Sequence, residues 1–141
     1  MNMTFLDRIH WIAVVVAALA YFVLGALWYS KILFAPKWVA YTKVDMNDPN
    51  GKKGFGAIMF GSFIFMFITC IAIATLVAKF KMSGCWNGMK LGTLTGFCFG
   101  VSAISISYLY EKRPLGLHLI NGGYTLIGNI IAAAIIAGWK F

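Results

Sequence analysis

The chain has 141 residues, of which 61% are hydrophobic and only 11% are charged. A soluble domain carries roughly a quarter of charged residues, so this composition excludes an ordinary water-soluble globular protein. The net charge of +8 would suit nucleic acid, but the basic residues lie at the ends of apolar runs and in one loop. We therefore expect no nucleic-acid partner, and expect contacts with membrane lipids, in particular with anionic headgroups.

Four long apolar runs predict an all-α, integral membrane four-helix bundle. We expect helices at about residues 9–30, 54–79, 88–110 and 114–139. Each run reaches the roughly 20 residues that a helix needs to cross the hydrocarbon core. The runs should be helical because backbone polar groups in lipid have no water to bond. With the loop at 31–53 they form a single transmembrane domain.

The loop at 31–53 divides into two parts. Residues 32–41 mix large apolar side chains with lysine and predict a short amphipathic segment in the interface, broken at Pro36. Residues 45–54, "DMNDPNGKKG", predict a solvated turn. Seven of the 12 Lys and Arg residues fall on this side of the predicted bundle. This bias favours a cytoplasmic loop and extracytoplasmic termini in a bacterial inner membrane.

The third predicted helix carries glycines at regular four-residue intervals, and Ala103 and Ser107 continue the same face. Small residues at this spacing let helix backbones approach closely in a membrane. The stripe therefore predicts close packing, either on a neighbouring helix of the same chain or on a second subunit. Its glycines are Gly88, Gly92, Gly96 and Gly100.

The fourth predicted helix carries a narrow polar stripe. Its members are spaced by three or four residues, so they share one face, and they cannot face hydrocarbon without a large penalty. The stripe is either a set of interhelical hydrogen bonds or the wall of a permeation path. It consists of His118, Asn121, Thr125 and Asn129.

No pattern of catalytic or metal-binding residues is present in the sequence. The four acidic residues lie outside the deep parts of the predicted helices, and the three cysteines lack metal-ligand spacing. The absence of an intramembrane carboxylate also argues against a proton-coupled transporter. We therefore expect neither an enzyme nor a bound metal or cofactor.

Two segments resemble a known family. "LWYS" at 27–30 and "YEKRPLGLHLINGGYTLIGN" at 110–129 are similar to sequences of the domain-of-unknown-function family 1761. Two positions differ, since Lys31 stands where that family usually has proline and Thr125 stands where it often has histidine. The resemblance implies small four-helix membrane proteins and implies no specific function. We place part of the motif at the membrane interface, with Glu111 paired to a nearby cation. The marked residues are Trp28, Tyr29, Glu111, Arg113, Pro114, Asn121 and Tyr124.

Three functional hypotheses follow from these patterns. The first is a non-enzymatic protein that acts through homo-oligomerisation or as an accessory subunit of a membrane complex, because of the glycine and polar stripes. The second is a passive channel or facilitator for a small solute, lined by the polar stripe. The third is a protein that binds a lipid or another hydrophobic ligand, with the basic loop contacting headgroups.

Overall fold

The computed structural model describes residues 7–30, 32–42 and 55–139, and within these ranges its regular secondary structure is all helix, with no strand. This confirms the predicted fold class. The solvated turn predicted at 45–54 lies outside the described residues. The third predicted helix begins at Cys85, three residues before the predicted start. The elements are α1 (Trp11–Trp28), α2 (Ala35–Thr42), α3 (Phe55–Lys79), α4 (Cys85–Thr95), the π-helix η3 (Gly96–Val101), α5 (Ser102–Tyr110) and α6 (Leu115–Gly138).

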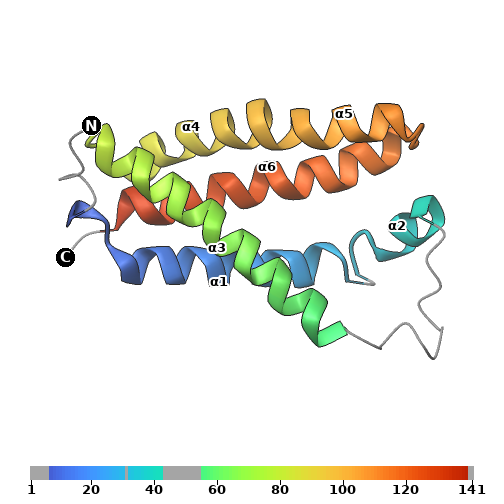
Figure 1. Cartoon of the computed structure of the whole chain (residues 1–141), viewed down its shortest axis with the longest axis horizontal. Helices are drawn as coiled ribbons and strands as arrows, with labels where there is room; N and C mark the ends of the chain where they lie inside the picture. Colours follow the sequence, from blue (N-terminus) through green and yellow to red (C-terminus); the bar gives the residue numbers. More distant parts are fainter. Residues whose placement is uncertain (1–6, 31, 43–54, 140–141) are drawn as a thin grey trace.

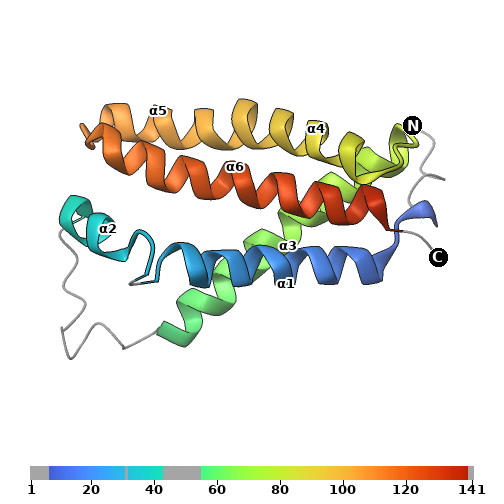
Figure 2. The same ribbon diagram turned by 180° about the vertical axis from the view of Figure 1, so that it is seen from behind.

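Helix α6 is the centre of the bundle. It lies between α1 and the continuous rod formed by α4, η3 and α5, and α3 crosses diagonally over α1 and α6 (Figures 1 and 2). Helix α1 begins and α6 ends at one end of the bundle, which we call the terminal end. The α5–α6 connection and α2 lie at the other end, which we call the hairpin end. Helix α6 therefore contacts every other helix of the bundle.

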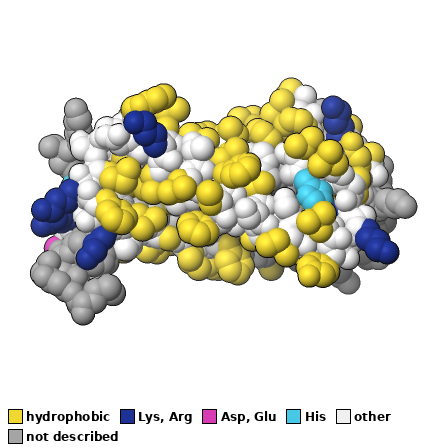
Figure 3. Space-filling model, turned by 90° about the horizontal axis from the view of Figure 1, so that it is seen from above, with side chains coloured by type: hydrophobic (Ala, Val, Ile, Leu, Met, Phe, Trp, Pro, Cys, Tyr) yellow, Lys and Arg dark blue, Asp and Glu magenta, His cyan; other side chains and the backbone are white. Residues whose placement is uncertain are grey.

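Within the described parts of the chain, four helices are long and apolar enough to cross a membrane. They are Trp11–Trp28, Gly56–Lys79, the rod Cys85–Tyr110 and Leu115–Gly138. On the face drawn in Figure 3, lysine and arginine side chains gather toward the two ends, and apolar side chains cover the middle. Exposed aromatic and aliphatic side chains occur along all four spans. This distribution is that of a small membrane protein whose outer surface faces lipid.

Helix α2 differs from the prediction at Pro36. The sequence analysis placed a break there, and this was wrong, because Pro36 is the second residue of α2. A proline in the first turn removes an N–H that has no intrahelical partner, so it starts a helix without loss. Tyr41 of α2 lies against Gly116 of α6, where a side chain larger than hydrogen would clash. This contact docks α2 onto the start of α6.

The glycine stripe packs directly against the backbone of α6. A Cβ placed on Gly88 would clash with the backbone of Ala133, and one on Gly92 would lie 2.5 Å from the Asn129 carbonyl oxygen. Gly96 is buried and lies against Leu126. As predicted, the third span thus makes a very close helix–helix approach, and the partner helix belongs to the same chain.

The π-helix η3 changes which residues of the third span face α6. A π turn adds one residue to the helical repeat, which rotates everything beyond it by about 100°. Gly100 and Val101 therefore both lie on the α6 side, where a Cβ on Gly100 would clash with the Thr125 side chain and Val101 contacts Gly122. Ala103 and Ser107, which we predicted to continue the glycine face, are exposed instead. That prediction was wrong because it assumed a regular α-helix.

We predict that Gly92→Ala lowers the free energy of unfolding by about 1–3 kcal/mol, because the added methyl group meets α6 backbone that cannot move aside easily. Gly61→Ala in α3 is the matched control, since a Cβ there would meet nothing within 4 Å. Circular dichroism during unfolding in mixed detergent micelles measures both variants. Equal stability of the two would contradict the close backbone contact.

Candidate functional site

Asn121 joins three segments at the hairpin end of the bundle. Tyr29 directly follows α1, and its hydroxyl donates to Asn121 Oδ1 at 2.5 Å. Asn121 Nδ2 in turn donates to the Tyr108 hydroxyl of α5 at 2.6 Å. Burial raises the pKa of the Tyr29 hydroxyl above its ordinary value, with a smaller contribution from neighbouring tyrosines. Tyr29 therefore stays protonated and remains a donor in this chain of hydrogen bonds.

The aromatic residues of the family motif turn toward α6. Trp28 Nε1 donates to the Ile120 carbonyl oxygen at 2.9 Å, and its ring lies over Gly123. The Tyr124 ring packs edge-on against Tyr29, with centroids 5.4 Å apart. Two motif segments separated by about 90 residues in sequence thus meet between α1 and α6. Sequence reasoning assigned these aromatics to the interface and did not foresee their contact with one another.

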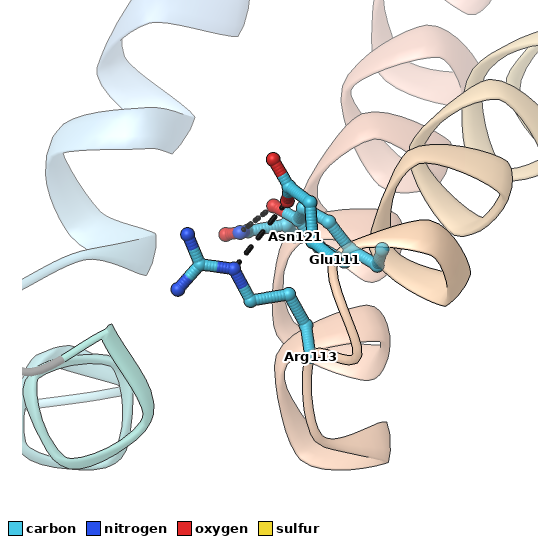
Figure 4. A network of polar contacts seen from close by, with 4 residues as sticks. Glu111, Arg113 and Asn121 are labelled. Carbon is cyan, nitrogen blue, oxygen red and sulfur yellow. Dashed lines mark hydrogen bonds and ion pairs between the residues drawn. The ribbon is translucent and has the colours of Figure 1, made fainter.

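The charged part of the motif lies beside this cluster. Arg113 Nε donates to Glu111 Oε2 at 3.4 Å, so Glu111 has the cationic partner that we expected (Figure 4). Both side chains are exposed, and such a pair contributes little to stability. Pro114 follows as the cap of α6. His118 is half-buried, and its ring packs edge-on against Tyr108 at 5.2 Å.

Asn129 and Thr125 lie one to two turns further along α6 and belong to a different environment. Thr95 of α4 donates to Asn129 Oδ1 at 3.1 Å, and Asn129 Nδ2 donates to the Thr125 carbonyl oxygen at 2.8 Å. Asn129 is only 5% exposed. The polar stripe is therefore divided, since Asn121 bonds tyrosines at the hairpin end and Asn129 bonds a threonine of the glycine-rich helix.

A cavity of about 480 Å³ opens beside Asn129, between α3 on one side and α4 with η3 on the other, and we call it the lateral groove. Helix α6 and Tyr21 of α1 form its floor. Its lining residues come from the middle of all four spans, so it lies at mid-depth of the bundle. None of the described residues that line it is a lysine, arginine, histidine, aspartate or glutamate. Its polar groups belong to Tyr21, Thr69, Thr95, Thr125 and Asn129.

The hydrogen bonds within the protein show which donors and acceptors of the lateral groove are available to a ligand. Thr69, Thr95 and Thr125 each use their hydroxyl proton on a carbonyl oxygen of the chain or on Asn129. A hydroxyl oxygen that donates can still accept, and the Asn129 amide, which is bonded to the Thr125 carbonyl oxygen, also lies beside the Tyr21 hydroxyl. The groove can therefore pair with a neutral group that both donates and accepts.

Three residues that line the lateral groove were singled out from the sequence, and one of them, Gly100, belongs to the glycine stripe. Thr125 and Asn129 were expected from the polar stripe. Tyr21, Thr69 and Thr95 were not, because isolated hydroxyl residues are common in membrane helices. Thr95 directly precedes Gly96 of the glycine stripe, and that position was the one available signal. Among the described residues, no three potential metal ligands gather anywhere, so the site gives no support for a metal.

Comparison with known proteins gives a family and no more. Residues 12–137 match a family model described as "Protein of unknown function (DUF1761)", which covers most of the chain. The chain therefore belongs to this family. No curated protein and no solved structure matches it.

We predict that Tyr29 and Asn121 are energetically coupled. Tyr29→Phe removes one donor, and Asn121→Leu removes the shared amide. The double variant should therefore lose less free energy of unfolding than the two single variants lose together. The expected coupling is about 0.6–1.7 kcal/mol, the range of hydrogen bonds between membrane helices. Unfolding of the four proteins in mixed micelles measures it. Tyr110→Phe, at an exposed tyrosine, is the control, and full additivity would rule out the bond.

Proposed function

We propose that this member of the DUF1761 family is a non-enzymatic membrane protein that binds a neutral lipophilic molecule in the lateral groove. The class of ligand is a long apolar chain or ring system with one hydroxyl or carbonyl group. The single observation that carries the proposal is the hydrogen-bonding floor of a groove that lies at mid-depth of the spans. Its volume lies in the range of small-molecule sites.

The chemistry of the groove supports a neutral guest. Uncompensated charge at the centre of a bilayer is costly, and the lining holds no cation or anion that would compensate it. Ile68, Ile73, Leu76 and Phe99 supply apolar walls. The Asn129 amide supplies the polar contact at the floor. A molecule that enters sideways from the lipid would match both parts.

A passive channel would use the same polar stripe differently. It would need His118, Asn121, Thr125 and Asn129 to border one continuous passage. Thr125 and Asn129 line the lateral groove, while Asn121 is held between two tyrosines and His118 packs on Tyr108. This division favours ligand binding over conduction. Solute flux through reconstituted protein that is lost in Asn129→Leu would favour the channel.

Assembly is a second candidate function, and the outward face of α5 favours it. Ser102, Ala103 and Ser107 are exposed on this helix, and no residue of α5 is buried. Small residues on a lipid-facing helix permit close contact with another helix. A homo-oligomer or an accessory role in a membrane complex would cover this face. Native mass spectrometry in mild detergent reports the oligomeric state and any co-purifying subunit.

We predict that Ala72→Trp blocks the lateral groove. Ala72 lines the groove from α3, so an indole there fills the space and weakens binding of a long-chain alcohol about tenfold. The probe is a photoreactive, alkyne-tagged fatty alcohol added to protein in nanodiscs. Peptide mapping should place the label on residues 68–76 or 125–129.

Ala57→Trp is the matched control, because Ala57 lies on the same helix, is exposed and is not part of the groove. It should label like the unmodified protein. Equal labelling of the two tryptophan variants, or a label spread evenly over the lipid-facing helices, would overturn the ligand proposal and leave assembly as the better candidate.

Orientation in a bacterial inner membrane belongs to the same proposal, with the hairpin end cytoplasmic. We predict that a membrane-impermeant maleimide labels Lys81→Cys on intact cells and does not label Tyr110→Cys. Both positions are exposed and lie at opposite ends of the bundle. Cys85 and Cys98, which are also exposed, are changed to serine in the background. The reverse labelling pattern would invert the orientation.

A further inference from the structure

A second cavity, of about 500 Å³, opens at the terminal end of the bundle, and we call it the terminal pocket. The residues before α1, the turn after α3 and the end of α6 meet there (Figure 1). It is separate from the lateral groove, because the two share no lining residue. It lies where the spans begin and end, which is the depth of the lipid headgroups.

The terminal pocket is lined by both basic and apolar side chains. Arg8, His10 and Lys81 supply nitrogen donors from two separate chain segments, and Ser83 adds a hydroxyl. None of the described residues that line the pocket is acidic. Trp139 and Met82 are among its apolar lining residues. An arginine and a lysine in one pocket, with no carboxylate among the described lining residues, favour an anion, and both side chains bind phosphate.

The backbone at Lys81 presents this cation at the pocket. Lys81 has a φ of 52°, in the left-handed region that favours glycine. The Lys81 N–H donates to the Ala78 carbonyl oxygen and the Met82 N–H to that of Val77, which is the Schellman ending of a helix. Glycine is the usual residue at this position. Lys81→Gly therefore removes the cation without adding conformational strain to the backbone.

The same ending recurs at the other end of the molecule and provides a matched comparison. Lys112 has a φ of 56° and closes α5 with the corresponding pair of hydrogen bonds to Leu109 and Tyr108. Lys112 does not line the terminal pocket. Lys112→Gly therefore makes the same change of charge and of backbone without touching the candidate site.

We propose that the terminal pocket binds an organic phosphate group, with Arg8 and Lys81 contacting the phosphate oxygens and the Trp139 side contacting the carbon skeleton attached to it. The phosphate can come from an anionic phospholipid of the surrounding leaflet or from a water-soluble phosphate ester. The apolar wall favours the lipid, because a soluble ester would leave that wall in contact with water.

The test measures retention of phosphatidylglycerol against phosphatidylcholine by native mass spectrometry of the whole chain in mild detergent. Lys81→Gly and Arg8→Gln should each weaken phosphatidylglycerol binding about tenfold, the size expected for one charge-assisted hydrogen bond. Lys112→Gly should bind like the unmodified protein. Thermal unfolding of Lys81→Gly should be unchanged or higher, which separates loss of the site from loss of the fold.

Glycerol phosphate added as a competitor distinguishes the two sources of phosphate. Retention of the lipid in its presence assigns the pocket to the membrane lipid, and displacement assigns it to a soluble ester. Equal losses in Lys81→Gly and Lys112→Gly would overturn the proposal, since the effect would then be general surface charge. No preference for phosphatidylglycerol, together with no effect of glycerol phosphate, would overturn it as well. Neither result bears on the lateral groove, which Ala72→Trp tests separately.

Discussion

The contact between the α4 glycines and the α6 backbone determines where the other elements of the bundle can lie. No side chain separates the two helices at Gly88 and Gly92, so their axes approach more closely than larger residues would allow. The short distance brings Thr95 within hydrogen-bond reach of Asn129. It also leaves α6 free on its other sides for α1 and α3. In lipid, where apolar side chains gain nothing by avoiding the solvent, such close packing and its hydrogen bonds are the main sources of helix association.

The π turn then divides the third span into two parts with different partners. Up to Gly96 the span presents glycines to the α6 backbone, and beyond it the span presents Gly100, Val101 and Tyr108 to α6 side chains and to Gly122. Without the inserted residue, Tyr108 would be rotated away by about 100° and could not accept the hydrogen bond from Asn121. The Tyr29–Asn121–Tyr108 chain and the exposed small residues of α5 are thus two consequences of one irregularity. π turns are often found at functional sites, and this one borders the lateral groove.

Much of the fold could be predicted from local sequence, while the lateral groove could not. The length of each apolar run predicts a span, Pro114 predicts the start of α6, and the glycine spacing predicts a close contact. The π turn has no comparable local signal, because "GFCFGV" is compatible with a regular helix. The groove depends on the diagonal path of α3, which results from long-range packing on α1 and α6. Tyr21 and Thr95 became site residues only through that packing.

The two cavities differ in charge because they lie at different depths of the membrane. Cations lie at the ends of the spans, where water and headgroups solvate them, and neutral hydrogen-bonding groups are the polar side chains that the middle tolerates. The net charge of +8 is therefore compatible with a mid-depth groove whose described lining residues carry no charge. The two proposed sites would therefore select ligands on different grounds. The terminal pocket would discriminate by the charge of a headgroup, and the lateral groove by the position of one hydroxyl or carbonyl on an apolar skeleton. A single molecule that satisfied only one of these conditions would occupy only one site, so occupancy of each can be measured while the other is blocked.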